Sequence, residues 1–326
     1  MDVRVGVGVS YKALWAGVDM SMQSGLYREY LPAMAEDGRL SMDTLDEAVR
    51  RVLDSKARMG LFDDPYRSLD PSREAASHFS PAHEELALSA ARKSVVLLKN
   101  EGSVLPLKKS GQKIALIGWW VNDKLNAEGC GVIWGNHSFV VPLGEGVAAA
   151  MGDPETELKT VEGSLIEEPI GGDGDGGIDA AKAAAEWADV VVLALGEPKN
   201  YTGEAQSRTD IVVPAAQQAL AEAVAAEGKP TVVLLKNGRA LALEGAVKDA
   251  EAIMVTWFLG KKSGTAIAEL LFGDHSPEGR LPVSFPVRSG QQPYFYNHAS
   301  SGRPCVGDSP PSARGRAFKN CWREIR

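Results

Sequence analysis

Two glutamates, Glu197 and Glu204, lie in a polar loop that follows a strongly apolar stretch of the chain, residues 190–195. The stretch ends at Gly196, a pattern typical of a buried strand in a parallel sheet. Open α/β sheets bind ligands in the loops at the carboxyl ends of such strands. A glutamate there can serve as a general acid once burial or a nearby negative charge raises its pKa. The sequence therefore predicts half of a carboxylate site in this loop, since most such chemistry needs a second carboxylate.

The elements that must position this loop alternate between strands and helices. Apolar stretches with strand character begin at residues 95, 113, 190, 231 and 252. Helical patterns cover residues 81–94, 178–188, 215–227 and 263–271. This alternation predicts an α/β fold over residues 71–300, with a mainly parallel sheet and helices on both of its faces.

The segment before the sheet, residues 16–70, has a helical pattern. Ser41 can cap a helix that begins after it, and Gly60 stands at the position of a C-terminal cap. A polar linker follows. Two helices without a sheet cannot hold a core of their own, so we expect this segment to pack on something else.

Composition narrows the class of protein. The chain has 326 residues, of which 44% are hydrophobic and 24% charged, and a net charge of -8. This is the composition of a globular protein with a sizeable core. Nucleic acid and anionic membranes attract positive surfaces, so neither is expected as a partner. The first residues lack the features of a signal peptide, and a cytoplasmic location is the default expectation.

No pattern for a metal or cofactor is present. The three cysteines, Cys130, Cys305 and Cys321, are too widely spaced for a zinc site or a disulfide framework. No glycine-rich phosphate-binding motif follows a strand, which argues against a nucleotide-binding domain. We therefore expect free thiols, no metal and no cofactor.

Several motifs in one order carry a family resemblance. They are AGVDMSM (16–22), LDEAVRRVLDSKARMGLFDDPY (45–66), SVVLLKNEGSVLPLKK (94–109), SRTDIVVP (207–214) and WFLGKKSGTAIAELLFGDHSPEGRLPVSFP (257–286). Together they resemble the second half of a glycoside hydrolase family 3 β-glucosidase. The resemblance implies that residues 16–70 are the last helices of a (β/α)8 barrel and that the following sheet domain is the α/β sandwich of the family.

The resemblance also implies a reaction and a substrate. Such enzymes resemble retaining glycosidases, in which the barrel supplies an aspartate nucleophile and the sandwich a glutamate acid/base, with the two carboxyls about 5 Å apart. Glu204 stands just before the QSRTD stretch, separated from it by Ala205, as the acid/base of similar bacterial members does, and is the favoured candidate. Glu197 is the second choice. The implied substrate is a β-linked glucoside or oligosaccharide.

The chain departs from the family pattern in its barrel part. No Ser-Asp pair followed by an aromatic residue or histidine occurs, so the nucleophile is missing from this sequence. Asp19 matches a position downstream of the nucleophile and is interpreted as structural. Residues 1–15 and 301–326 have no counterpart in the pattern, and the tail is expected to be disordered. A truncated or frame-shifted product, or a non-catalytic carbohydrate-binding remnant, is the alternative to an active enzyme.

Three further expectations concern particular surfaces. Trp134 follows the strand at 113 in a segment that corresponds to a cleft loop of the family, and it is the candidate for stacking on a sugar, whereas Trp119 and Trp120 are expected to pack against helices. Arg208 is expected to pair with Asp210 and stiffen the loop. The barrel-derived helices would expose an apolar face that favours self-association.

Overall fold

The computed structural model describes residues 3–170 and 176–292, which form two compact units that divide between Ser80 and Pro81. Each unit is described by itself. The expected disordered tail, together with Cys305 and Cys321, lies outside the described residues. Within the described part of the chain, no helix is both long and apolar enough to cross a membrane.

The first unit consists of four helices, α1 (Val3–Trp15), α2 (Leu26–Glu36), α3 (Met42–Arg58) and the short α4 (Pro71–Ser77). The Ser41 side chain accepts a hydrogen bond from the backbone N–H of Asp43 and so caps α3, as predicted. Gly60 follows α3 with φ 71°, the left-handed conformation that favours glycine. Helix α1 occupies residues for which no helix or strand was expected. The small core of this unit contains Leu14, Leu31, Met34, Leu40 and Ala48.

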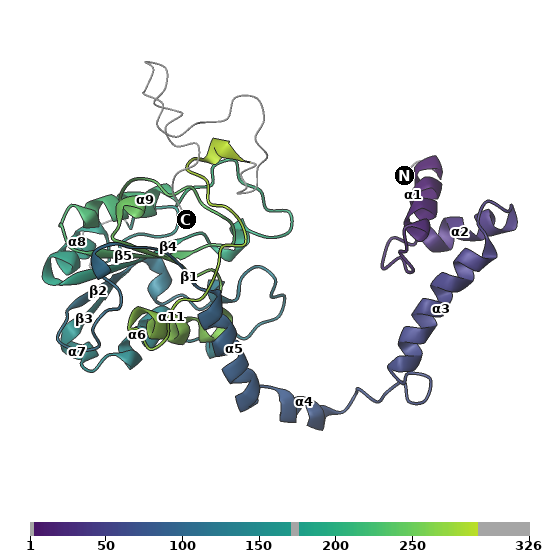
Figure 1. Cartoon of the computed structure of the whole chain (residues 1–326), viewed down its shortest axis with the longest axis horizontal. Coiled ribbons are helices and arrows are strands. Elements are labelled where there is room, and N and C mark those ends of the chain that lie inside the picture. Colours follow the sequence, from purple (N-terminus) through teal and green to yellow (C-terminus); the bar gives the residue numbers. More distant parts are fainter. Residues whose placement is uncertain (1–2, 171–175, 293–326) are drawn as a thin grey trace, which may run out of the picture. The chain divides into compact units, whose positions relative to one another are not determined.

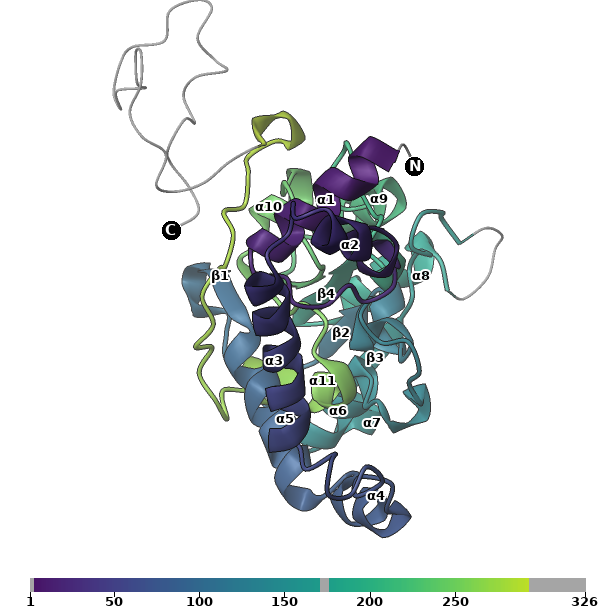
Figure 2. The same cartoon turned by 90° about the vertical axis from the view of Figure 1, so that its right-hand side faces the viewer.

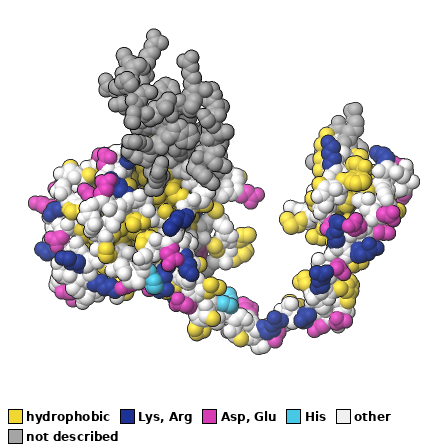
Figure 3. All heavy atoms as spheres, viewed as in Figure 1, with side chains coloured by type: hydrophobic (Ala, Val, Ile, Leu, Met, Phe, Trp, Pro, Cys, Tyr) yellow, Lys and Arg dark blue, Asp and Glu magenta, His cyan; other side chains and the backbone are white. Residues whose placement is uncertain are grey.

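Large apolar side chains remain on the surface of this unit (Figure 3). The most exposed are Met22, Leu69, Tyr66, Phe62, Met20 and Trp15, with exposed fractions between 61% and 92%. A unit of this size with so small a core leaves apolar surface available to a partner.

The second unit contains a six-stranded sheet with the order β1-β6-β5-β4-β2-β3. Its strands are β1 (Val96–Asn100), β2 (Ile114–Ile117), β3 (Leu158–Val161), β4 (Val190–Gly196), β5 (Thr231–Lys236) and β6 (Ala252–Val255). All neighbours pair in parallel except β1, which lies antiparallel to β6 at one edge. The expected mainly parallel sheet is confirmed.

Helices cover both faces of the sheet, as can be followed in Figure 1 and Figure 2. Helices α8 (Ile178–Trp187), α9 (Ala215–Ala225) and α10 (Gly245–Asp249) pack on one face, and α5 (Pro81–Ser94), α6 (Leu143–Ala150) and α11 (Ser263–Leu271) lie on the other. Side chains of β4 alternate between these layers: Val191, Leu193 and Leu195 join the first, and Val190, Val192 and Ala194 join the second. Both sides of β4 are therefore core, which explains its uninterrupted apolar sequence.

Strand β3 and helix α6 are among the elements that the sequence patterns did not predict. Strand β3 has the sequence LKTV, is half exposed and stands at the sheet edge, so it lacks the apolar run of a central strand. Helix α6 contains Gly144 and Gly146, residues that normally argue against a helix. Gly146 lies against α11, where a Cβ would come within 2.2 Å of the backbone of Gly264. Close contact between the two helices, not helix propensity, accounts for this glycine.

The order in which the chain adds strands to the sheet reverses direction once, at β2 and β4. From β2 the chain passes through α6 to β3 at the edge, then returns through α8 to β4 on the opposite side of β2. It continues from there through β5 to β6. The connections on either side of β2 therefore cover opposite faces of the sheet, and their loops diverge at the carboxyl ends of β2 and β4.

Candidate active site

Glu197 is the first residue after β4, and its side chain is fully buried. Its carboxylate forms ion pairs with Arg239, at 3.1 Å from Nε to Oε2, and with Arg208, at 3.3 Å from Nη1 to Oε1. Burial raises the pKa of Glu197, while the two guanidinium groups oppose that rise. The contacts make Glu197 the anchor of the loop that follows it.

Arg239 fixes the loop at a second point. Its Nη2 donates a hydrogen bond to the backbone carbonyl of Tyr201, so one guanidinium holds both Glu197 and Tyr201. The Tyr201 hydroxyl donates to Glu167 at 2.5 Å, and Arg208 covers the Tyr201 ring at 4.4 Å from its centroid. Burial and the hydrogen bond to Glu167 raise the pKa of Tyr201 to about 12.

The expected pair between Arg208 and Asp210 does not form. Arg208 turns to Glu197 and Glu167, whereas Asp210 accepts a hydrogen bond from the Ser289 hydroxyl at 2.7 Å. A buried carboxylate has no water to satisfy it, so it competes more effectively for a guanidinium than an exposed aspartate two residues away. Sequence proximity alone suggested the wrong partner.

Glu204 stands on an exposed turn of the same loop. The turn is closed by a hydrogen bond from the Gln206 N–H to the Gly203 carbonyl, and Ala205 has the positive φ of 59° that this turn requires. Gly203 has φ 104°, and a Cβ there would come within 2.5 Å of the Cys130 sulfur. The Cys130 segment therefore lies against the backbone next to Glu204, and no described residue forms a hydrogen bond or ion pair with the Glu204 carboxylate.

A buried polar cluster joins the loop after β2 to the loop after β4. Asp123 accepts hydrogen bonds from the backbone and side-chain N–H groups of Asn126, at 3.0 and 2.9 Å. The Asn126 side-chain oxygen in turn accepts the backbone N–H of Lys199 at 2.9 Å. Lys236, at the end of β5, is also buried, and burial lowers its pKa to about 8, opposed by the charge of Asp123. These contacts hold the two loops in fixed register.

The three tryptophans of the β2 loop have different environments. Trp120 is 1% exposed and belongs to the core that contains α6 and α11, and Trp119 is partly buried at the edge of that core. The expected packing of both is confirmed. Trp134 is 95% exposed, so its indole is available to a ligand.

A groove of about 630 Å³ lies beside this loop. Its lining comes from the loops after β2, β3 and β4, and consists of Trp119, Leu125, Asn126, Leu165, Ile166, Glu167, Glu168, Pro198, Lys199, Asn200 and Tyr201. Neither Glu204 nor Trp134 contributes to it. The sequence patterns did not identify this groove, because its walls are assembled from three separate loops.

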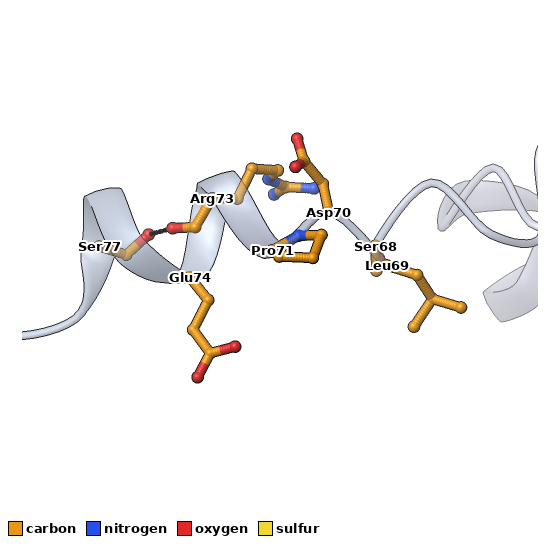
Figure 4. Close-up of a pocket in the computed structure, with 7 residues that line it drawn as sticks. All are labelled: Ser68, Leu69, Asp70, Pro71, Arg73, Glu74 and Ser77. Atoms are coloured by element: carbon orange, nitrogen blue, oxygen red, sulfur yellow. Dashed lines mark hydrogen bonds between the residues drawn. The ribbon is translucent and has the colours of Figure 1, made fainter.

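A second hollow, in the first unit, has a different character (Figure 4). It runs along the start of α4, and its lining is a single stretch of chain from Ser68 to Ser77. Every lining residue is exposed. A short exposed helix and the residues before it, without an opposing wall, enclose no ligand, so we assign no site there.

Asp19, the aspartate interpreted as structural, also lies in the first unit. Its carboxylate forms an ion pair with Arg51 of α3 at 2.9 Å. Burial, and to a smaller extent the negative charge of Asp19, raise the pKa of the Tyr27 hydroxyl. Tyr27 donates to the Val18 carbonyl at 2.6 Å. These contacts tie the turn after α1 to the neighbouring helices.

Four residues of this region were not singled out from the sequence: Arg239, Asp123, Asn126 and Lys236. Arg239 follows β5 and Asp123 follows β2, so a search for charged residues at the carboxyl ends of all expected strands would have found both. Lys236 closes an apolar strand, where a buried cation is not expected without a partner. Asn126 offered no comparable signal.

Comparison with known proteins identifies the family. Residues 95–319 match the glycosyl hydrolase family 3 C-terminal domain. The periplasmic β-glucosidase of Salmonella typhimurium is 41% identical over 324 residues, which cover 94% of this chain and 42% of that protein. The chain belongs to glycosyl hydrolase family 3, and the resemblance drawn from the motifs is confirmed.

Solved structures agree with this assignment. The crystal structure of β-glucosidase from Listeria innocua in complex with isofagomine has a TM-score of 0.82 and 35% identity, covering 94% of this chain and 41% of that one. A mutant of the Listeria enzyme in complex with laminaribiose gives a TM-score of 0.83 and 34% identity, covering 97% and 42%. The chain thus spans about two fifths of the length of these relatives.

Proposed function

We propose that this chain carries the acid/base half of a retaining β-glucosidase site, with Glu204 as the proton donor. The observation that supports this role is the contrast between the two loop glutamates. Glu204 is exposed on a turn whose backbone is held by Gly203 and Ala205, whereas Glu197 is fully buried between two arginines. A proton donor must reach the leaving oxygen, and a carboxylate enclosed by guanidinium groups cannot.

Glu197 then acts as the support of the loop rather than as its reactive group. Its ion pairs and the contact from Arg239 to the Tyr201 carbonyl fix the chain from residue 197 to residue 201, three residues before Glu204. Positioning of this kind limits the motion of an acid relative to the bond it protonates. Trp134 is proposed to offer its exposed indole face to a substrate sugar.

The substrate class follows from the relatives. A β-linked glucoside or short oligosaccharide is proposed, because the similar Listeria enzyme is solved with laminaribiose. The retaining reaction needs a second carboxylate about 5 Å from the acid. We assign none of the described carboxylates to that role, so turnover by this chain alone is expected to be very low.

A chimera tests the assignment. This chain would replace the corresponding 42% of the Salmonella β-glucosidase, and the activity of the unmodified chimera on aryl β-glucosides would be the reference. The Glu204→Gln change should reduce turnover of substrates with poor leaving groups by about 10²–10⁴-fold. A substrate with a very acidic leaving group needs little protonation and should be affected far less.

The Glu197→Gln chimera is the matched control. It should lose stability while keeping the normal dependence on the leaving group. If Glu197→Gln instead of Glu204→Gln produces the leaving-group effect, the roles of the two glutamates are reversed. If neither does, the chain is a carbohydrate-binding or inactive remnant.

We also propose that the first unit mediates self-association. Phe62, Tyr66 and Leu69 are each more than 60% exposed, and together with Trp15 and Met22 they give this unit more apolar surface than an isolated small domain usually keeps in water.

A further inference from the structure

The groove beside the loop that follows β4 lies where the strand order of the sheet reverses, between β2 and β4. Trp119 and Asn126 come from the loop after β2, and Pro198 and Tyr201 come from the loop after β4. These strands are neighbours, and the chain leaves them toward opposite faces of the sheet. Open α/β sheets bind ligands in the crevice that such a reversal creates at the carboxyl ends of the strands. The position of the groove therefore indicates a ligand site independently of its shape.

The walls of the groove are held before any ligand arrives. One wall is a small hairpin, in which Ser164 pairs with Pro169 and the Leu165 N–H bonds to the Glu168 carbonyl at 2.9 Å. The buried side chain of Gln217 ties this hairpin to the end of β4, donating to the carbonyls of Ile166 and Gly196 at 2.9 Å each. A rigid wall lowers the entropy lost on binding.

The opposite wall, residues 198–201, is fixed at both ends. Asn126 accepts the Lys199 N–H, and Arg239 binds the Tyr201 carbonyl. The hydrogen bond from Tyr201 to Glu167 then joins this wall to the hairpin. The volume of about 630 Å³ lies within the range of about 300–1,000 Å³ that small-molecule sites occupy.

The lining combines apolar surface with hydrogen-bonding groups. Trp119, Leu125, Leu165, Ile166 and Pro198 give the groove an apolar surface that includes one indole ring. Lys199, Asn200 and Glu168 add an ammonium, an amide and a carboxylate, and none of their side chains makes a hydrogen bond or ion pair within the described structure. A pyranose has the matching chemistry, with apolar C–H faces and a rim of hydroxyls.

The charged groups of the lining argue against a phosphate or a nucleotide as the ligand of the groove. The groove contains two carboxylates, Glu167 and Glu168, against the single ammonium of Lys199. Arg208 lies 3.9 Å from Glu167, but its guanidinium is shared with the fully buried Glu197 and stacks on the Tyr201 ring. A phosphate or nucleotide would find no unpaired guanidinium in the lining and would lie near the carboxylate of Glu168, whereas a neutral polyhydroxy ligand needs no positive charge to bind.

We propose that this groove is a saccharide-binding subsite for neutral β-linked oligosaccharides, separate from the position of the sugar that Glu204 protonates. The choice of ligand rests on the proposed function, while the existence of the site rests on the groove itself. A sugar held there touches Tyr201, three residues before Glu204, so the groove would select extended substrates at the entrance to the site.

The experiment is a calorimetric titration of the full chain with laminaribiose, glucose and inorganic phosphate. Laminaribiose is expected to bind with a dissociation constant on the order of 1 mM, more tightly than glucose, and phosphate is expected not to bind. The Asn200→Ala change, which removes an exposed amide and should not disturb folding, is expected to weaken laminaribiose binding by about fivefold. Trp119→Ala should weaken it further, with circular dichroism as the check on folding.

Glu186→Gln changes an exposed residue of α8 that does not line the groove, and it should leave laminaribiose binding unchanged. Trp134→Ala separates this subsite from the proposed catalytic position, because Asn200→Ala should weaken laminaribiose binding in that background as well. The proposal is overturned if laminaribiose does not bind, if binding depends on Trp134 but not on Asn200, or if phosphate binds and Asn200→Ala abolishes that binding. If Glu204→Gln does not reduce turnover in the chimera, the proposed function is refuted. The binding of laminaribiose in the groove would not be affected by that outcome.

Discussion

Arg239 binds Glu197 through Nε at 3.1 Å and the Tyr201 carbonyl through Nη2, so a single guanidinium fixes both ends of the segment that leads to the candidate acid. Glu197 is fully buried, whereas Arg239 keeps about a fifth of its side chain exposed. The pair is therefore asymmetric: the carboxylate depends on the arginine, but the arginine retains some contact with water.

Replacing Glu197 should destabilise the sandwich far more than replacing Glu204. Glu197→Gln leaves two arginines without their charged partner, and breaking a buried pair costs about 3–5 kcal/mol, with the lower end expected here because both arginines are partly exposed. Glu204→Gln changes an exposed turn residue and should alter the free energy of unfolding by about 0.5 kcal/mol or less. Urea denaturation of the two variants compares them directly, and equal losses would show that Glu197 is not an anchor.

Lys236 should make the protein more stable as the pH rises above 8. Its pKa is about 8 in the folded chain and 10.5 in the reference state, so between these values the unfolded chain binds a proton that the folded chain does not. The free energy of unfolding then rises with pH, by up to about 1.4 kcal/mol per pH unit. Urea denaturation at pH 8 and pH 9.5 should show this rise in the wild-type chain and not in Lys236→Met.

The upper limit of that pH window is set by Tyr201. Its folded pKa of about 12 lies above the reference value of 10, so its stabilising contribution is complete below pH 10 and is lost as the pH rises toward 12. Measurements below pH 10 therefore isolate the lysine. A slope that is the same in wild type and Lys236→Met would show that this lysine keeps its proton when folded.

Gly203→Ala should displace the turn that carries Glu204. The new methyl group would meet the Cys130 sulfur at 2.5 Å, and the φ of 104° is strained for alanine. We expect a loss of about 1–3 kcal/mol in the free energy of unfolding and faster reaction of Cys130 with a thiol reagent, measured with Cys305 and Cys321 replaced by serine. Gly228→Ala is the matched control, since Gly228 also has a positive φ, 67°, but no atom within 4 Å of the new methyl.

Self-association should depend on the exposed apolar residues of the first unit. Sedimentation of the wild-type chain at rising concentration is expected to show species larger than a monomer, because burying such side chains is favourable by about 25 cal/mol per Å². Phe62→Glu combined with Leu69→Glu should shift the population toward monomer. Leu97→Glu, on the sheet-edge strand β1, serves as the control substitution on the other unit, and an equal effect there would contradict the proposal.

The parts of the fold with repeated local signals could be predicted from the sequence. The central strands β4 and β5 are apolar throughout because both of their faces are buried, and Ser41 and Gly60 mark the ends of α3 by their capping chemistry. Strand β3 and helix α6 could not be predicted in this way. One is too short and exposed to show a pattern, and the other contains glycines required by its contact with α11.

The candidate site, too, could be predicted from the sequence only in part. Glu197 and Glu204 follow a recognisable strand, so both could be found, but the sequence could not tell which of them is buried. Burial is decided by Arg208 and Arg239, and Arg239 is separated from Glu197 by 42 positions. The groove could not be predicted from the sequence at all, because contacts between the loops after three different strands create it.

The reversal of strand order at β2 and β4 determines which residues of this domain can be substituted without loss of the fold. Ile117 and Leu195, near the ends of β2 and β4, are wholly buried and form part of the framework, whereas Leu165, Glu168 and Asn200 are exposed at the groove. Replacing the exposed residues leaves the framework intact. A designer could therefore exchange the exposed hairpin residues Leu165 and Glu168, altering what the sandwich binds while the buried Ser164 and the contacts that make the domain fold stay in place.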